Sequence, residues 1–179
     1  FKVEFIHVNH SIADSVAFAI KTPIGTVVQT GDFKIDVTPL QGEMTDLTRF
    51  GELGREGVLA LLMDSTNVER PGHSLSESKV HDRFDQLFKD CDKRIIVTTF
   101  ASNVDRIRQI IDLAVKYKRK VGITGRSMEN VVKLCVELGY MKVPDGILVD
   151  MKRIGSVPRN KLVILSTGSQ GESCLLYTS

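Results

Sequence analysis

Downstream of residue 72, apolar segments typical of β-strands alternate with segments typical of amphipathic helices. In the helix predicted over 103–119, five apolar residues fall on one face at helical spacing, namely Val104, Ile107, Ile110, Ile111 and Ala114. Strands are predicted at 94–100, 120–125 and 161–171, and further helices at 74–89 and 127–139. This alternation predicts βαβ units and a mostly parallel sheet of the Rossmann-like α/β class, although no GxGxxG motif is present.

The first part of the chain has a different texture, in which strands dominate. A strand is predicted at 1–8, and an antiparallel hairpin at 15–32 that turns around Pro23 and Gly25. A short helix at 45–57 and a buried strand that ends at Asp64 are expected to follow. The Pro71–Gly72 pair predicts a domain boundary or a crossover near residue 72. Ser74 and Glu77 form a capping-box pattern for the helix after the boundary.

Composition excludes several classes of protein. With 42% hydrophobic and 26% charged residues, the 179-residue chain is typical of a globular protein of one or two domains. A net charge of +2 gives no overall basic field, so nucleic acid would need a local basic patch. Three scattered cysteines without a CxxC pair favour a reducing, cytoplasmic setting. No apolar run is long enough for a membrane span, and no signal peptide is visible.

His10 and Asp32 stand at the two ends of the predicted hairpin segment. Imidazole nitrogen and carboxylate oxygen are both ligands for Zn²⁺ and similar divalent ions, and a hairpin can return the chain to the same sheet edge. The residues alone favour a structural alternative, in which His10 is a loop residue and Asp32 forms a turn after Gly31. Spacing leaves both interpretations open.

Three predicted strands of the second part end in small polar clusters, at 98–103, 124–130 and 166–172. Ligands of open parallel sheets bind beyond the carboxyl ends of the strands, where hydroxyls, helix N-termini and a basic side chain such as Arg126 suit phosphate. In the alternative interpretation, Ser102, Asn103 and Ser127 only cap the helices that follow. Because three such clusters follow strands of one sheet, a phosphate-binding rim and a set of helix caps are about equally well supported.

Six blocks of the sequence resemble the bacterial ribonuclease J family of the metallo-β-lactamase superfamily, which carries a β-CASP insertion. The resemblance extends from Phe1 to Glu172, and its most specific blocks, in the family's order, are VNHSIADS, TGDFKID, MDSTNVERPG, TTFASNVDRI, GRSMENV and STGSQGE. The resemblance implies part of an αββα metallo-β-lactamase domain at 1–72 and part of a Rossmann-like β-CASP domain at 73–172. The last seven residues, SCLLYTS at 173–179, do not match the family pattern and are expected to be a non-native tail.

The resemblance also implies a two-zinc hydrolase that cuts RNA phosphodiester bonds, as a 5′-to-3′ exonuclease and as an endonuclease, in RNA decay and maturation. His10 matches a metal ligand, Asp32 the carboxylate that bridges two metals, and Asp64 an acidic residue beside the metal centre. The RNA-side candidates are Ser102, Asn103, Arg126, Ser127, Ser169 and Gln170. RNA is the implied partner, with no membrane, and the family implies a cytoplasmic homo-oligomer, a dimer or a tetramer.

The chain also departs from the family pattern. The HxHxDH ligand cluster is absent, and the chain starts at Phe1 without Met, so we expect a fragment that is inactive alone. The alternatives are a DNA-directed β-CASP nuclease and a non-catalytic RNA-binding or scaffolding paralogue. The GRSM and GSQGE blocks favour the RNA enzyme, and retention of His10, Asp32 and Asp64 argues against a decayed site.

Overall fold

A computed structural model describes residues 1–40, 42–72 and 74–168. The chain forms two compact units, residues 1–80 and the part from His81 onward, and each is described by itself. Among the described residues, none of the helices is long and apolar enough to cross a membrane. The predicted non-native tail at 173–179 lies outside the described residues.

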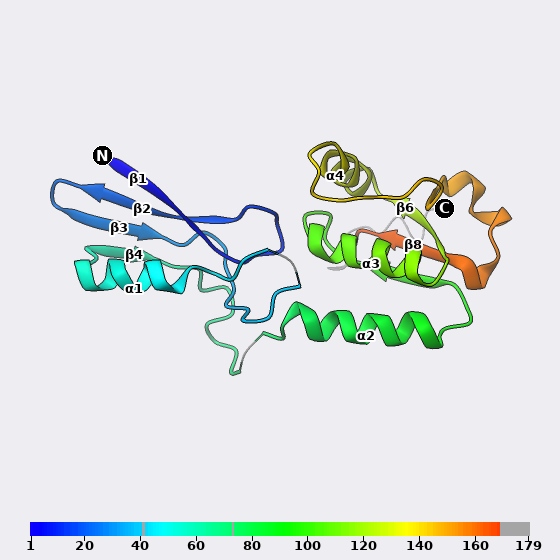
Figure 1. Ribbon diagram of the computed structural model, residues 1–179, viewed down its shortest axis with the longest axis horizontal. Coiled ribbons are helices and arrows are strands. Elements are labelled where there is room, and N and C mark those ends of the chain that lie inside the picture. Colours follow the sequence, from blue (N-terminus) through cyan, green and yellow to red (C-terminus); the bar gives the residue numbers. More distant parts are fainter. Residues whose placement is uncertain (41, 73, 169–179) are drawn as a thin grey trace. The chain divides into compact units, whose positions relative to one another are not determined.

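The first unit is a four-stranded sheet with one helix (Figure 1). Strands β1 (Lys2–His7), β2 (Val16–Thr22) and β3 (Gly25–Gln29) are antiparallel neighbours, and β4 (Ala60–Leu62) pairs in parallel with β3. Helix α1 (Leu47–Glu56) connects the loops between β3 and β4. The predicted hairpin is confirmed, because Thr22 pairs with Gly25 across a two-residue turn.

Helix α1 covers one face of this sheet. Its Leu53, which is 1% exposed, packs into a cluster with inward-facing residues of the strands and of the segment after β1, namely Ile6, Val8, Ala17, Ala19 and Val28. The small Ala17 and Ala19 let the helix approach the sheet closely. The alternate residues of the strands point to the other face, where Phe5 is 68% exposed in the described structure.

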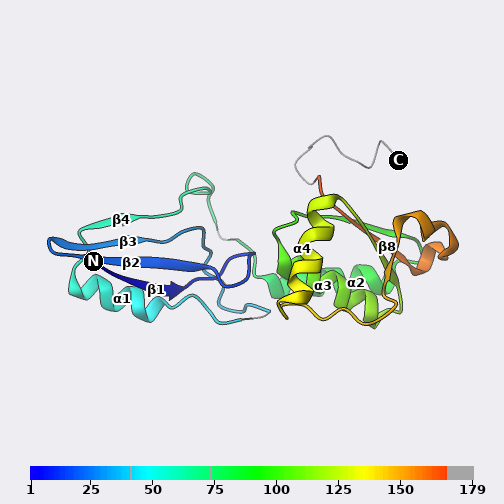
Figure 2. The same cartoon turned by 90° about the horizontal axis from the view of Figure 1, so that it is seen from above.

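The second unit is a parallel sheet in the order β5-β8-β6-β7. Its strands are β5 (Ile95–Thr98), β6 (Lys120–Thr124), β7 (Leu148–Val149) and β8 (Leu162–Ser166). Helices α2 (Glu77–Asp90), α3 (Val104–Lys116) and α4 (Arg126–Glu137) accompany it, with the short 3₁₀ helices η1 (Met151–Ser156) and η2 (Arg159–Lys161) (Figure 2). The predicted parallel α/β sheet is therefore confirmed.

Residues from the three helices and one face of this sheet form a single core. Val121 and Val163 pair in register and face Ile107 and Ile110 of α3 and Met128 of α4 in the same cluster. All five apolar residues predicted for the inner face of α3 are buried. On the opposite face, Gly122 lacks a side chain where a Cβ would lie 2.9 Å from the Met151 sulfur, so η1 can pack directly on the strand.

Two local predictions are wrong. The strand that ends before Asp64 is not buried, since Leu61 and Leu62 are 57% and 55% exposed among the described residues, where β4 forms a sheet edge. The capping box of Ser74 and Glu77 does not form, because α2 begins at Glu77 and the hydroxyl of Ser76 accepts a hydrogen bond from the Ser78 N–H. The Glu77 N–H is bound by the Asp36 carboxylate, a partner that is remote in sequence.

Candidate functional site

A single β-bridge between Asn9 and Lys34 brings His10 and Asp32 together. The Lys34 N–H donates to the Asn9 carbonyl at 2.8 Å, so the segments that follow β1 and β3 run antiparallel at this point. The Nε2 of His10 lies 4.0 Å from the Oδ2 of Asp32, and both side chains reach solvent, with exposed fractions of 30% and 79%. The hairpin thus unites the two residues that the sequence singled out.

The His10–Asp32 pair lies close to the spacing of two ligands of one metal ion. Zinc binds histidine nitrogen and carboxylate oxygen at about 2.0–2.2 Å in a tetrahedral arrangement, which places two ligand atoms about 3.4 Å apart. The 4.0 Å separation would therefore have to shorten by about half an ångström for both atoms to bind one zinc ion. Zinc sites need about four ligands, of which one can be water. Within the described part of the chain, His, Cys, Asp and Glu form no group of three or more that could hold a metal. The pair therefore supplies part of a coordination sphere.

Asp64 follows β4 and is hydrogen-bonded to Thr30, the residue after the end of β3. The Asp64 N–H donates to the Thr30 hydroxyl at 3.1 Å, and the Thr30 N–H donates to the Leu62 carbonyl at 3.0 Å. The pKa of Asp64 lies below its usual range, chiefly because the Thr66 hydroxyl and N–H donate hydrogen bonds to its carboxylate. The N–H of Phe33, the residue after Asp32, and the charge of His10 lower this pKa further.

The backbone around His10 is held by a buried network centred on Asn9. The Asn9 amide donates to the Glu43 carbonyl at 2.6 Å and accepts from the Thr45 N–H at 3.0 Å. The Asn9 N–H donates to the Thr45 hydroxyl, which in turn donates to the Lys34 carbonyl at 3.2 Å. Asn9 and Thr45 are 8% and 6% exposed, so these bonds are shielded from water.

Sequence reasoning missed Asn9, Thr45 and Thr30 as positioning residues. Asn9 directly precedes His10, and Thr30 precedes Asp32 by two positions, so their places beside the candidate ligands were available as a signal. Thr45 carried no such signal, because only the fold brings it next to Asn9. These residues hold the backbone from which His10, Asp32 and Asp64 project.

In the second unit, the described parts of the three polar clusters predicted as a rim begin at the same end of the sheet. Thr98, Ser166 and Thr124 are aligned across β5, β8 and β6, so the segments that follow these strands start at the same edge. Gly125 adopts a φ of +108°, and a Cβ there would lie 3.0 Å from the Thr167 hydroxyl. A glycine therefore lets the end of β6 and the end of β8 approach each other closely.

The individual rim residues differ in their surroundings. Asn103 is the N-cap of α3, and its side chain accepts the Arg106 N–H at 3.0 Å, as the capping interpretation predicts. Ser102 is exposed beside it, and Arg126 and Ser127 are exposed in the first turn of α4. The cap residue of α4 is Gly125, which has no side chain to bind the amides of that turn. Ser169 and Gln170 lie outside the described residues.

Comparison with known proteins gives a consistent result. Residues 92–177 match the family model described as "Ribonuclease J, beta-CASP domain". A protein named Ribonuclease J from Synechocystis sp. is 51% identical, over 99% of this chain and 28% of its own length. A Ribonuclease J from Helicobacter pylori is 45% identical over 97% of this chain and 25% of its own length. Ribonuclease J2 of Bacillus subtilis is 39% identical over 99% of this chain and 32% of its own length. The chain thus spans about a quarter to a third of the curated relatives it matches.

The fold also occurs among solved structures. A crystal structure of a protein of unknown function from Enterococcus faecalis V583 matches with a TM-score of 0.64 over 94% of this chain and 42% of that chain. Its sequence identity is 17%, so the similarity concerns the fold alone.

Proposed function

We propose, since this chain belongs to the ribonuclease J family over nearly its whole length, that it forms part of a metal-dependent ribonuclease that hydrolyses RNA phosphodiester bonds. The observation that carries the proposal is the convergence of His10 and Asp32 at 4.0 Å, bordered by Asp64. A histidine nitrogen and a carboxylate oxygen at one solvent-accessible point are donor types that a hydrolytic metal centre uses.

In this proposal, His10 and Asp32 are metal ligands and Asp64 is an acidic residue beside them. Zinc ions in such a site would supply a water-derived nucleophile and would stabilise the charge that develops on the phosphate. The hydrogen bonds from Thr66 lower the pKa of Asp64 and favour its ionised form, so the carboxylate can accept a hydrogen bond near the reacting phosphate but is a weak base. Asn9 and Thr30 hold the backbones of these three residues in place.

The rim of the second unit is proposed to bind the RNA backbone. Arg126 contributes a positive charge, and the first turn of α4 presents amides that no side chain of its cap residue binds. Ser102 and Ser127 add exposed hydroxyls. Asn103 uses its side-chain oxygen as a helix cap, so it contributes at most its amide nitrogen. Ser169 and Gln170 remain candidates from the sequence.

The chain alone is proposed to be inactive. His10 and Asp32 supply two ligands, and the described residues offer no third one for the same ion. Cleavage activity therefore needs ligands other than those described. A cytoplasmic location and a homo-oligomeric state are proposed from the family resemblance alone.

A chimera tests the proposal directly. The matching segment of the Synechocystis relative, which covers 28% of that protein, would be replaced by this chain, and hydrolysis of a labelled single-stranded RNA would be measured. We expect cleavage that depends on added metal and that falls by at least about 100-fold in Asp32→Ala. Asp92→Ala, which removes an exposed carboxylate of the second unit, is the matched control and should retain activity. Equal cleavage by Asp32→Ala would refute the proposed site.

The same chimera separates the alternatives. A DNA-directed nuclease would cleave a single-stranded DNA of the same sequence faster than the RNA. A scaffolding paralogue would bind RNA without cleaving it. For the rim, Arg126→Ala should weaken RNA binding and lower the slope of log affinity against log salt by about one, whereas Arg55→Ala at the end of α1 should not.

A further inference from the structure

The second unit contains a groove that no part of the proposed ribonuclease function uses. It has a volume of about 800 Å³ and lies between α4, the edge of the sheet at β6 and β7, and the loop that joins α4 to β7. This volume is in the range of about 300–1,000 Å³ that is usual for ligand sites. The groove therefore has room for a ligand of several side chains.

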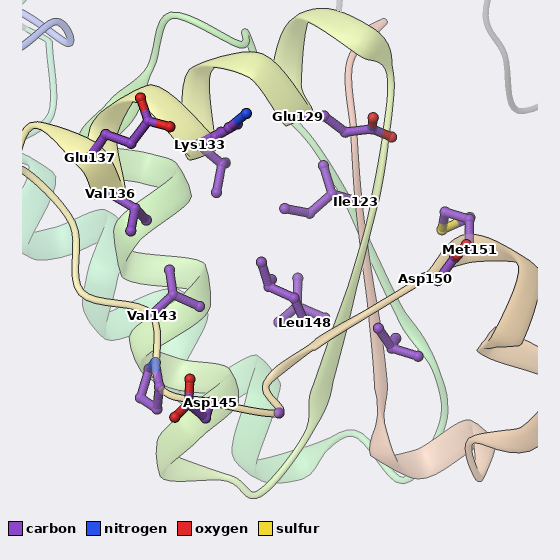
Figure 3. A pocket seen from close by; sticks show the side chains of 15 residues that line it. Ile123, Glu129, Lys133, Val136, Glu137, Val143, Asp145, Leu148, Asp150 and Met151 are labelled. Carbon is purple, nitrogen blue, oxygen red and sulfur yellow. The ribbon is translucent and has the colours of Figure 1, made fainter.

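The bottom of the groove is apolar. Val121 and Val132 are buried, Ile123 and Val143 are partly buried, and Val136 and Leu148 are each 42% exposed. Figure 3 shows the side chains of Ile123, Val136, Val143 and Leu148 around the centre of the hollow. Apolar side chains left open to water in this arrangement favour an apolar ligand.

The rim of the groove carries mostly negative charge. Four carboxylates line it, from Glu129, Glu137, Asp145 and Asp150, against a single ammonium from Lys133. The Asp150 carboxylate accepts the Lys152 N–H at 2.8 Å, and the neighbouring Lys120 ammonium is bound by the Gly146 carbonyl. Among the described side chains, Glu129, Glu137 and Asp145 have no ion-pair partner.

This local charge is opposite to that of the chain as a whole, which is +2. A polyanion such as RNA would be repelled by the four carboxylates, so the groove is not an extension of the RNA rim. A ligand that complements it has an apolar centre and positive charges at its ends. Lysine and arginine side chains that flank leucine or valine residues have this chemistry.

The sheet edge favours a peptide as the carrier of that chemistry. β7 is the last strand of the sheet, pairs only with β6 among the described strands, and contributes Leu148 and Val149 to the groove. An extended segment beside such an edge can add backbone hydrogen bonds while alternate side chains enter the groove.

We propose that this groove binds a short peptide segment of a protein partner in which apolar residues are flanked by lysine or arginine. The proposal does not depend on the ribonuclease function, because none of the residues that carry it belongs to the metal-binding or RNA-binding candidates. Exposed apolar residues provide the contact area, and the carboxylates select for the cationic ends.

The test uses the 179-residue chain and three capped tetrapeptides: Lys-Leu-Leu-Lys, Gln-Leu-Leu-Gln and Glu-Leu-Leu-Glu. Binding would be followed through the amide signals of isotopically labelled protein. We expect the basic peptide to shift signals of Val136, Leu148 and Val149 and to bind at least about tenfold more tightly than the acidic one. Equal binding of the three peptides, no binding of the basic one, or shifts confined to other residues would overturn the proposal.

Variants of exposed residues provide the matched control. Glu137→Lys combined with Asp145→Lys should lower the affinity for the basic peptide by about tenfold or more and raise the affinity for the acidic peptide. Glu69→Lys combined with Asp92→Lys makes the same change in net charge at exposed positions outside the groove and should leave both affinities unchanged. The same response in both double variants would show that only the overall charge matters, which would contradict the proposal.

Discussion

His10 and Asp32 lie 4.0 Å apart, measured from Nε2 to Oδ2, because the bridge between Asn9 and Lys34 joins the segments that carry them. Neither residue belongs to a regular strand, so the sheet alone does not fix their positions. The hydrogen bonds of Asn9, Thr45 and Thr30 complete that task. Metal ligands are usually oriented by such outer contacts, so the geometry of the His10–Asp32 pair depends on these hydrogen bonds.

Thr30→Val should impair the site more than the fold. Valine keeps the shape of threonine but removes the hydroxyl that binds the Asp64 N–H and the Gly31 carbonyl. We expect RNA cleavage by the chimera to fall by about 10- to 100-fold, with a loss of roughly 1–2 kcal/mol in the free energy of unfolding. Thr26→Val, at a partly buried position of β3, is the control. Unchanged cleavage in Thr30→Val would show that Asp64 does not need this contact.

Asn9→Ala should destabilise the first unit. The substitution removes the acceptor of the Thr45 N–H and the donor to the Glu43 carbonyl, both in a region where Asn9 is 8% exposed. We expect the free energy of unfolding in urea to drop by about 2–3 kcal/mol. Asn67→Ala, at an exposed turn, should change it by less than about 0.5 kcal/mol. Similar effects of the two substitutions would remove the basis for a special role of Asn9.

Asp36→Asn should lower stability in a pH-dependent manner. Burial at 5% exposure acts to raise the pKa of Asp36, but hydrogen bonds from Glu77, Ser76 and Thr38 and the charge of Lys34 outweigh it, so the pKa lies below 3.8. A carboxyl group with a depressed folded-state pKa stabilises the fold above its unfolded pKa, and this contribution is lost as pH falls through the folded pKa.

The free energy of unfolding in urea, measured at several pH values for the unmodified chain and for Asp36→Asn, tests this prediction. Near pH 7 the Asn variant should be less stable by about 1–2 kcal/mol, and the difference should shrink as pH falls below about 4. A difference that stays constant down to about pH 3 would mean that the lost charge is not its cause.

Gly125→Ala should destabilise the second unit and disturb the rim. The backbone of Gly125 has a φ of +108°, and a Cβ would meet the Thr167 hydroxyl at 3.0 Å. We expect a loss of about 1–3 kcal/mol. Gly54→Ala, inside α1 with open space around it, should instead stabilise the chain by about 0.5–1 kcal/mol. A neutral Gly125→Ala would show that the ends of β6 and β8 can separate without cost.

The second unit could be predicted from the sequence because local patterns determine its elements. The alternation of apolar strands with helices such as α3 required a parallel sheet, and the aligned ends of β5, β8 and β6 placed the polar clusters at one edge. The two-residue β7 and the 3₁₀ helix η1 were not predicted, because neither is long enough to show a hydrophobic period.

The candidate site could be predicted only in part. The hairpin indicated that His10 and Asp32 could meet, but the contact depends on the bridge at Asn9 and on Thr45, which follows 36 positions later. The start of α2 was misplaced for a similar reason, since its first N–H is bound by Asp36, far away in the sequence. Tertiary hydrogen bonds of this kind leave no local pattern in the chain.

The central claim is that His10 and Asp32 bind a metal, and metal content tests it most directly. The chimera with the Synechocystis relative would be purified, dialysed against metal-free buffer and analysed for bound zinc by elemental mass spectrometry. We expect bound zinc in the unmodified chimera and in Asp92→Ala, and a clear loss of zinc in both His10→Ala and Asp32→Ala with circular dichroism unchanged. Full zinc content in both variants would contradict the claim and return His10 and Asp32 to a structural role.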